Sequence, residues 1–221
     1  RHEAWGNLAR KLAHEIKNPL TPIQLTIDRI KTKYSEKVDN NQKENFEENL
    51  KIINNQIKQI ENLVNEFSDF ARMPKPILNN NDLNLIIKEN VKLLKQIDQS
   101  IIINIINNSD SALLNCDKEQ ISRVLLNLIK NSIESIQEKA SKINNFNKEI
   151  LIELINTNTY IKIIITDNGK GFDNIEDNIN VMLDPYYTTK KNGTGLGLSI
   201  VNKIINDHNG IIKFISIKNG A

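Results

Sequence analysis

The sequence contains one cysteine and no long apolar run, and both absences limit what the chain can be. A single cysteine, Cys116, excludes an internal disulfide and favours a reducing compartment. It lies in a short apolar run, which is typical of a buried structural thiol. No stretch approaches the roughly 18 apolar residues that a membrane-spanning helix needs, so we expect these residues to be soluble.

An excess of one charge is also missing, since 29 basic residues nearly balance 27 acidic ones. The net charge of +2 provides no electrostatic argument for binding nucleic acid or an anionic membrane surface. No signal peptide and no initiator methionine precede the first expected helix, so we expect an upstream part of the protein to be missing. The 221 residues suffice for two small domains, which is the organisation that we predict.

Two segments near the N-terminus carry apolar residues at alternating steps of four and three. In the first segment these are Ala9, Ala13, Ile16, Leu20, Ile23, Ile27 and Ile30. In the second segment they are Phe46, Leu50, Ile53, Ile57, Ile60, Val64 and Phe67. This spacing predicts two amphipathic helices, joined by a polar stretch near 33–42, that form a helical hairpin. Because two such helices cannot enclose a core, we expect a homodimer whose hairpins form a four-helix bundle; the alternative is a hairpin packed on its own C-terminal domain.

The stretch Leu12–Pro22, Leu-Ala-His-Glu-Ile-Lys-Asn-Pro-Leu-Thr-Pro, contains a candidate phosphate acceptor, His14. His14 follows a position of the apolar seam, so we expect its ring beside the buried stripe and within reach of solvent. Glu15 comes next, and Asn18 lies one turn further on the same face. Two prolines each remove a backbone hydrogen bond, so the helix should bend here. By itself, a His-Glu pair on a helix is more often a solvated surface pair.

The second helix is expected to end at Arg72–Pro76, since the residue before each proline is pushed towards extended conformations. We place a domain boundary there, between residues 1–73 and 74–221. In the second domain the pattern predicts helices at about 82–95, 118–138 and 196–208, and strands at about 101–106, 112–116, 149–156, 160–166 and 211–217. Asp117 is the expected N-cap of the long helix. Helices that alternate with antiparallel strands indicate an α+β sandwich with one face of the sheet covered.

Polar residues in two places of the second domain suit a nucleotide. Asn127 and Asn131 are four residues apart on the polar face of the long helix, and neutral amide oxygens suit a hard cation that phosphates already neutralise. After an Ile-rich strand, Asp167 opens the turn Asp-Asn-Gly-Lys-Gly-Phe, where a carboxylate can accept a hydrogen bond from an amine such as that of adenine. Gly169 and Gly171 of this turn allow the backbone to approach a ligand closely.

A glycine-rich loop, Gly193-Thr194-Gly195-Leu196-Gly197, runs into the last expected helix. Free N–H groups and the positive end of that helix would point at an anion. The loop lacks the Gly-Lys-Ser/Thr ending of a Walker A motif and the βαβ frame of a Rossmann fingerprint. The sequence therefore indicates a phosphate site of another kind.

Taken in order, these motifs resemble the H, N, G1, F and G2 boxes of bacterial sensor histidine kinases. The boxes are His-Glu-x-x-Asn-Pro, an Asn-x-x-x-Asn helix, Asp-x-Gly-x-Gly-Phe, Asp184-Pro-Tyr-Tyr-Thr-Thr-Lys190 and Gly-Thr-Gly-Leu-Gly. They cover essentially the whole chain, and the run from 14 to 25 looks most like nitrogen-regulation sensor kinases of the NtrY type. The family more often has phenylalanines at Tyr186 and Tyr187, and a final strand would normally follow Ala221.

The resemblance implies a dimerisation and histidine-phosphotransfer hairpin followed by a Bergerat-type α/β sandwich that binds ATP and Mg²⁺. It implies Asn131 as the Mg²⁺ ligand, Asn127 near the phosphates and Asp167 on the adenine amine. The adenine pocket and the lid over the phosphates would comprise Gly169, Gly171, Lys190, Gly193, Thr194, Gly195, Leu196 and Gly197.

The implied reaction is transfer of the γ-phosphoryl group of ATP to His14 and then to an aspartate of a response-regulator receiver domain. Glu15 would accept the δ-nitrogen proton of the ring and leave the ε-nitrogen free to attack. Asn18 would hold a water for removal of phosphate from the receiver. The resemblance places the whole protein in the bacterial inner membrane through upstream segments, with these residues in the cytoplasm.

Two other functions stay open on the sequence alone. An ATP-driven conformational machine of the gyrase, Hsp90 and MutL kind has a similar nucleotide fold but hydrolyses ATP with water. Such proteins use a glutamate one turn before the metal asparagine, whereas this chain has Asn127 there, which argues against hydrolysis as its purpose. The other alternative is a catalytically silent dimer scaffold, against which the intact boxes argue.

Overall fold

The computed structural model describes residues 2–109, 111–157, 159–172, 182–184, 188, 193–217 and 220–221. The chain divides into two compact units, of which the first comprises Arg1–Pro74 and Thr188–Leu196. The second comprises Lys75–Tyr187 and Gly197–Ala221. Each unit has its own elements and its own core, and each is described by itself.

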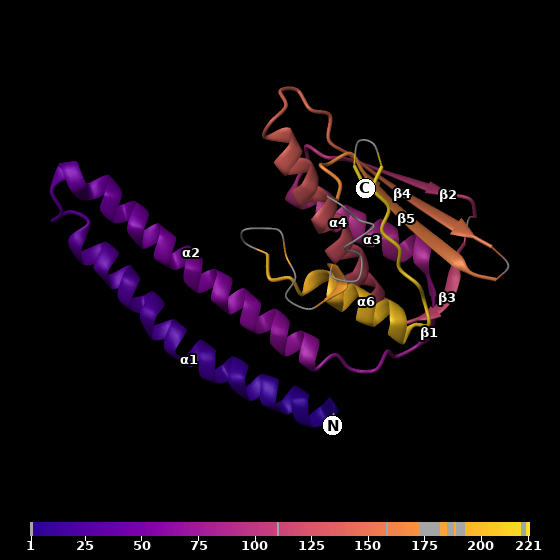
Figure 1. The fold of residues 1–221 in the computed structure, drawn as a ribbon, viewed down its shortest axis with the longest axis horizontal. Coiled ribbons are helices and arrows are strands. Elements are labelled where there is room, and N and C mark those ends of the chain that lie inside the picture. Colours follow the sequence, from indigo (N-terminus) through magenta and orange to yellow (C-terminus); the bar gives the residue numbers. More distant parts are fainter. Residues whose placement is uncertain are drawn as a thin grey trace. The chain divides into compact units, whose positions relative to one another are not determined.

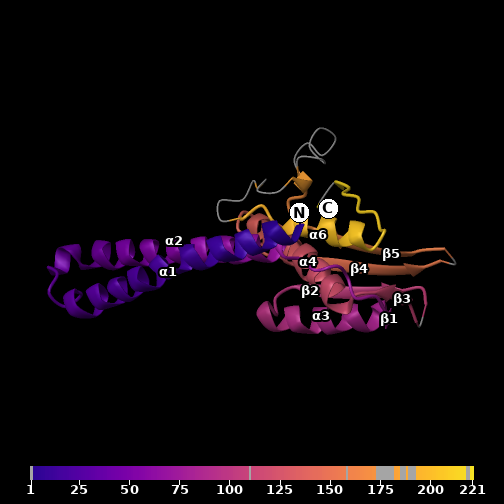
Figure 2. The same ribbon diagram turned by 90° about the horizontal axis from the view of Figure 1, so that it is seen from below.

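The first unit is built on the predicted helical hairpin. Helix α1 spans His2–Tyr34 and helix α2 spans Asn40–Ala71, and the two run side by side in Figure 1 and Figure 2. Helix α1 continues past both of its internal prolines. Helix α2 ends where the sequence predicts, since the Arg72 N–H donates to the Ser68 carbonyl and two prolines follow.

Only half of the predicted apolar seam is buried within one hairpin. The buried positions are Ala9, Ala13, Leu20, Ile27, Leu50, Ile57 and Val64. Between them, Ile16, Ile23, Ile53 and Ile60 keep 41, 45, 44 and 42% of their surface exposed. A two-helix hairpin covers one side of each seam, so a stripe of large apolar side chains faces outward. No helix in the described ranges is long and apolar enough to cross a membrane.

The second unit has three helices and five strands among its described elements. The helices are α3 (Leu83–Ile97), α4 (Lys118–Ala140) and α6 (Gly197–Asp207). The strands are β1 (Asn79–Asp82), β2 (Ile102–Asn107), β3 (Leu113–Cys116), β4 (Glu149–Asn156) and β5 (Ile161–Asp167). These bounds confirm the three predicted helices and four of the five predicted strands to within about two residues.

The strands form two sheets, one with the order β2-β4-β5 and a small one that pairs β1 with β3. Strand β5 is antiparallel to β4, with Ile152 opposite Ile165. Strand β2 is parallel to β4, with Ile103 opposite Ile150, so the expectation of purely antiparallel strands is wrong. The chain passes through β3 and α4 between β2 and β4, and such a crossover allows two strands to point the same way.

One apolar cluster joins α3 and α4 to the three-stranded sheet, as a sandwich with helices on the sheet requires. Leu125, Ile129 and Ile136 of α4 are at most 1% exposed in this cluster. Ile150 and Ile152 of β4 meet them at the same level of burial. The packing therefore leaves the opposite, polar face of α4 for other contacts.

Two local predictions differ from the structure. The expected strand at 211–217 is absent from the described residues there, which contribute only an isolated bridge between Ile217 and Gly220. Alternating apolar residues make a strand only when a neighbouring strand edge pairs with them. Outside a sheet, Ile211 is 84% exposed. Strand β1, of sequence Asn-Asn-Asn-Asp, was not predicted because these residues disfavour strands; it forms by pairing with β3.

Candidate functional site

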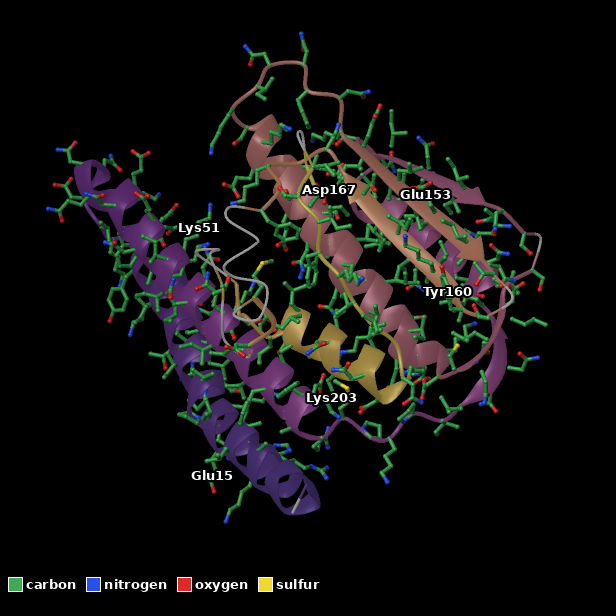
Figure 3. The ribbon with its side chains drawn as sticks, turned by 45° about the vertical axis from the view of Figure 1, so that its right-hand side comes forward. Glu15, Lys51, Glu153, Tyr160, Asp167 and Lys203 are labelled. Carbon is green, nitrogen blue, oxygen red and sulfur yellow. The ribbon has the colours of Figure 1, made fainter. Side chains whose placement is uncertain are left out.

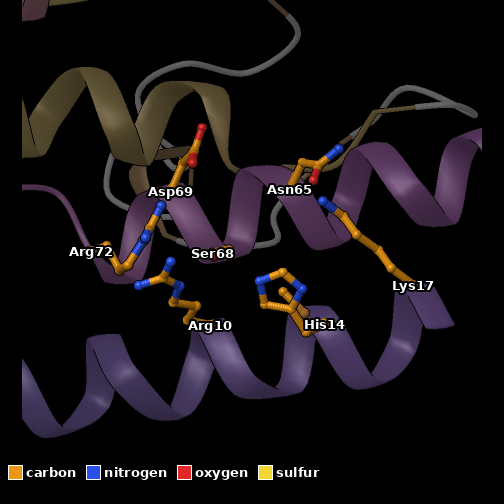
Figure 4. A pocket seen from close by; sticks show the side chains of 8 residues that line it. Arg10, His14, Lys17, Asn65, Ser68, Asp69 and Arg72 are labelled. Atoms are coloured by element: carbon orange, nitrogen blue, oxygen red, sulfur yellow. The ribbon is translucent and has the colours of Figure 1, made fainter.

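A hollow of about 170 Å³ lies between α1 and α2 beside His14. Its lining comprises Arg10, Ala13, His14, Lys17, Asn65, Ser68, Asp69 and Arg72. Figure 4 shows the His14 ring rising from α1 towards α2, with the Arg10 guanidinium beside it. His14 is exposed, as the sequence predicts for a residue next to the seam. The structure therefore presents this imidazole to solvent at the mouth of a polar hollow.

Glu15 and Asn18 lie on α1 near His14 but outside the lining of this hollow. In the described part of the chain no hydrogen bond joins Glu15 to His14, although the sequence predicts one. Consecutive side chains of a helix point about 100° apart, so the two residues do not face each other in this conformation. Figure 3 shows Glu15 on the outer side of α1. Asn18 is exposed one turn after His14, on the same face.

Helix α4 is positioned by its cap, Asp117, as the sequence predicts. The Asp117 carboxylate accepts hydrogen bonds from the N–H groups of Glu119 and Gln120 at 3.0 and 3.1 Å, and from that of Ile77 at 2.8 Å. Burial alone would raise the pKa of Asp117, but these N–H groups favour the charged form and hold its pKa below the usual value. The charged carboxylate also lies at the positive end of the helix, where it is stabilised.

The same residue connects α4 to α6. The Asp117 N–H donates to Nε2 of His208 at 3.0 Å, while Nδ1 of His208 lies 2.8 Å from the Ile204 carbonyl oxygen. Because Nε2 accepts, Nδ1 must carry the proton in this arrangement. His208 thus has a packing role, which the sequence does not reveal.

The predicted metal-binding asparagines lie on α4 as expected, four residues apart. The side-chain N–H of Asn127 donates to the Arg123 carbonyl at 2.9 Å, so the Asn127 Oδ1 takes no part in that hydrogen bond. That oxygen lies 3.2 Å from where a Cβ would stand on Gly197, the first residue of α6. Asn131 is half-buried one turn further along. The structure thus brings Asn127 to the N-terminus of α6, where helix N–H groups lack intrahelical partners.

Asp167 ends β5 and is only 6% exposed (Figure 3). Its Oδ1 accepts a hydrogen bond from the Gly169 N–H at 2.9 Å. Its backbone N–H donates to the Ala221 carbonyl at 2.7 Å, and the Ala221 N–H donates back at 3.2 Å. A buried carboxylate held by local backbone groups is suited to accept a hydrogen bond from a ligand amine.

The turn after Asp167 is held against α4 by two residues outside the predicted motifs, Ser135 and Lys139. The Lys139 ammonium donates to the carbonyl oxygens of Asn168 and Gly169, both at 2.9 Å. The Lys170 N–H donates to Ser135 Oγ at 3.1 Å. Ser135 and Lys139 are four residues apart on α4, so they share one face of the helix. This spacing is the sequence signal that two polar side chains could contact the same segment.

The two glycines of this turn serve packing, in addition to any ligand approach. A Cβ on Gly169 would lie 2.3 Å from Ser135 Oγ and 2.8 Å from the Ile136 nitrogen. Gly171 has a φ of +73°, which side-chain-bearing residues rarely adopt, and its Cβ would lie 2.6 Å from the Gly220 carbonyl oxygen. The predicted reason for both glycines, space for a ligand, is therefore incomplete.

The glycine-rich loop is described only in part. Lys190, Tyr186 and Tyr187 lie outside the described residues. Gly193–Leu196 group with the first unit, where the Thr194 hydroxyl donates to the Glu66 carboxylate of α2. Gly197 alone of the loop groups with the second unit and begins α6.

The residues of the second unit fit a nucleotide with a hard cation. Among the residues that the structure describes, no three His, Cys, Asp or Glu side chains gather to hold a metal ion. Amide oxygens such as that of Asn131, together with phosphate oxygens, are ligands that suit a hard divalent ion. A buried carboxylate at Asp167 for an amine and a positive helix end at Gly197 for phosphate complete the fit.

Two protein-family models match the chain, one after the other. The His Kinase A (phospho-acceptor) domain matches residues 4–76, which contain His14 and the hairpin. The histidine kinase-, DNA gyrase B- and HSP90-like ATPase family matches residues 116–220, which contain Asn127, Asn131 and Asp167.

Relatives with similar sequences are named as sensor kinases. The NtrY-like sensor histidine kinase of Rickettsia felis is 37% identical over 95% of this chain and 33% of its own length. The nitrogen regulation protein NtrY of Azorhizobium caulinodans is 36% identical over 96% of this chain and 27% of its own length. The chain spans about a third of the first of these relatives and about a quarter of the second.

Solved structures share the fold. Histidine kinase ThkA in complex with the response regulator protein TrrA has a TM-score of 0.65 and 24% identity, covering 98% of this chain and 59% of that chain. Full-length ShkA in complex with AMPPNP has a TM-score of 0.65 and 17% identity, covering 91% of this chain and 41% of that chain. The catalytic domain of ThkA alone is 28% identical, with a TM-score of 0.51, over 59% of this chain and 81% of that chain.

Proposed function

The chain belongs to the sensor histidine kinases, and we propose that it transfers the γ-phosphoryl group of ATP to His14 and then to an aspartate of a response-regulator receiver domain. The observation that carries this proposal is the order of the two family matches, a phospho-acceptor domain followed by an ATPase domain. The exposed ring of His14 in the first match agrees with it.

His14 acts as the nucleophile through the lone pair of its neutral ring at Nε2. The new P–N bond forms there as the bond from the γ-phosphorus to the bridging oxygen breaks, and ADP leaves with that electron pair. Glu15 would hold the Nδ1 proton after a side-chain rotation, because in the present conformation the two residues do not face each other. Catalytic hydrogen bonds are often formed only in the substrate complex.

The second unit would hold ATP and Mg²⁺ with Asn127, Asn131, Asp167 and the N-terminus of α6. Mg²⁺, when bound, would neutralise phosphate charge. Asp167 would orient the base by accepting its amine hydrogen bond, and Lys139 keeps the turn after Asp167 in place. A water-dependent ATPase needs a carboxylate base one turn before the metal asparagine, and Asn127 has no basic oxygen for that purpose.

The test is incubation with labelled ATP and Mg²⁺, followed by exposure of the protein to acid and to base. Phosphohistidine is labile in acid and resists base, whereas released inorganic phosphate without labelled protein would indicate an ATPase. His14→Gln should abolish the label. His2→Gln is a matched control, because His2 is also followed by a glutamate, and it should retain the label. A label that survives in His14→Gln overturns the assignment.

We also propose a homodimer formed through the exposed apolar stripe of the hairpin. Four large residues at 41–45% exposure along two helices leave apolar area that a second hairpin can bury. Ile53→Glu should convert a dimer into a monomer in light scattering. Leu85→Glu, which changes a residue of α3 that is 58% exposed, should leave the dimer intact. Dissociation by both variants, or by neither, contradicts the proposed interface.

We further propose that the protein removes phosphate from its receiver, and that Asn18 separates the two activities. Its amide could hold a water in line with a phospho-aspartate docked at His14. Asn18→Ala should keep most autophosphorylation and slow loss of phosphate from the receiver by roughly tenfold. Equal loss of both activities would show that Asn18 only supports the helix near Pro19.

The whole protein is proposed to lie at the bacterial inner membrane through segments outside this chain, with these residues in the cytoplasm. The sensor-kinase names of the relatives support this location. Fractionation of cells that express the full gene tests it, and recovery of the protein only in the soluble fraction would contradict it.

A further inference from the structure

The hollow beside His14 is lined by three cationic side chains and one carboxylate. Arg10 precedes His14 by one turn of α1, Lys17 follows it by one turn, and Arg72 comes from the end of α2. The carboxylate is that of Asp69, which in Figure 4 points away from α1 and from the His14 ring. The three cations thus line the same hollow as the imidazole, with the Arg10 guanidinium beside the ring in Figure 4.

Among the described residues, these three cations have no ion-pair partner. In the described ranges no ion pair or hydrogen bond uses the side chain of Arg10, Lys17 or Arg72; at Lys17 only the backbone carbonyl accepts, from the Thr21 hydroxyl at 3.5 Å. Elsewhere in the chain several lysines do pair, for example Lys170 with Glu138 at 2.7 Å. Like charges gathered in one hollow repel each other, and they are stabilised when an anion enters.

We propose that this hollow is a phosphoryl-binding site in which Arg10 and Arg72, with Lys17, hold the phosphoryl group carried by phosphorylated His14. The proposal rests on the proposed function for the identity of the phosphorylated residue. A phosphoryl group brings about 1.5 to 2 negative charges at neutral pH and three strong acceptor oxygens. A guanidinium can donate to two such oxygens at once, which suits arginine better than lysine to this role.

The expected consequence is stabilisation of the phosphorylated state over the free one. The cations lie around the acceptor, so they interact with the phosphoryl group after its transfer. Because Arg10 and Arg72 are solvent-exposed, each should change the equilibrium between phosphorylated and free protein by about two- to fivefold, and the two by roughly tenfold together. The hollow would thus raise the fraction of protein that retains phosphate until a receiver arrives.

The experiment uses phosphoramidate, which phosphorylates imidazoles without ATP or Mg²⁺. The ring Nε2 bonds to phosphorus as the P–N bond of phosphoramidate breaks and ammonia leaves, and the ring then releases its Nδ1 proton to solvent. The full chain is treated and followed by ³¹P NMR, with His14→Gln and His2→Gln assigning the signals. Since the reagent is an anion, the proposal predicts faster labelling of His14 than of His2.

Two measurements then isolate the hollow. In the double variant Arg10→Gln, Arg72→Gln, the phosphoryl group on His14 should lose its second proton at a pH higher by about half a unit or more. The rate at which phosphoramidate labels His14 should also fall towards that of His2. Arg10→Lys keeps the positive charge, so this variant should retain most of the wild-type labelling rate and most of the wild-type pH of deprotonation. If Arg10 had only a structural role, lysine would not preserve these two values. Lys11→Gln removes a charge next to Arg10 but outside the hollow and should change neither measurement.

Free inorganic phosphate shares this chemistry, so a separate arm adds it to unphosphorylated protein. The proposal is overturned if free phosphate shifts the NMR signals of the His14 ring at concentrations that leave the signals of the phosphorylated protein unchanged. The hollow would then be a site for free phosphate. Equal labelling of His14 and His2, or the same effect from Lys11→Gln, would also overturn it. Because no ATP is used, failure of the kinase assay and failure of this site are separate results.

Discussion

Replacing Asp117 with alanine removes one carboxylate that joins three backbone N–H groups at the start of α4. Loss of an N-cap costs about 1 kcal/mol, and the bond to the exposed Ile77 N–H adds up to about 1 kcal/mol. The free energy of unfolding of the second unit should therefore fall by about 2 kcal/mol at neutral pH. With a urea dependence of roughly 1.5 kcal/mol per molar, the urea midpoint should fall by about 1.3 M.

The assay is urea unfolding followed by far-UV circular dichroism. The single tryptophan, Trp5, lies in α1, so its fluorescence reports on unfolding of the hairpin separately. Asp39→Ala is the matched control, because Asp39 occupies the N-cap position of α2 without a side-chain cap bond. It should change stability by less than about 0.5 kcal/mol. An unchanged midpoint for Asp117→Ala would refute the reasoning.

The same variant has a defined pH dependence. Because the folded pKa of Asp117 lies below its unfolded value, its stabilisation is complete above about pH 4 to 5 and is lost as the pH falls through the folded pKa. The difference between wild type and Asp117→Ala should stay constant from pH 5 to 7 and shrink at lower pH. A difference that persists unchanged at pH 2 would show that the carboxylate charge is not its cause.

Three further outcomes are expected. Asn131→Ala should abolish Mg²⁺-dependent autophosphorylation with an unchanged circular dichroism spectrum, and incorporation equal to wild type would remove Asn131 from the metal site. Gly169→Ala should lower the thermal midpoint of the second unit and weaken nucleotide binding in calorimetry, because its Cβ would lie 2.8 Å from the Ile136 nitrogen; Ser135→Ala, which removes only the hydroxyl, should be milder. Burial raises the pKa of the Cys116 thiol, which is 0% exposed, so maleimide should modify it slowly at pH 7 and rapidly in urea; fast modification of the folded chain would contradict this.

Local features of the chain could be predicted because their causes are local. The steps of four and three identify α1 and α2, and the prolines after Arg72 end the second helix, since both depend on neighbours within one or two turns. Asp117 was predicted as a cap for the same reason, and the structure shows its hydrogen bonds. The ordered motifs, read through their resemblance to a family, predicted which residues would gather around a nucleotide.

Pairings between distant segments needed the tertiary structure. Strand β1 is polar and exists because β3 lies beside it, while the apolar run at 211–217 joins neither sheet among the described residues. The parallel direction of β2 and β4 follows from the crossover through α4, which strand propensity does not encode.

The candidate site divides in the same way. The sequence alone placed His14, the proposed acceptor, beside the apolar seam, because helix periodicity determines that position. Only the tertiary structure showed that Arg72 of α2 shares a hollow with Arg10 and His14, and that Lys139 of α4 holds the turn after Asp167. The physical reason is that side chains tens of residues apart meet only when packing of apolar faces has brought their backbones together, and periodicity determines a face but not the residue that it meets.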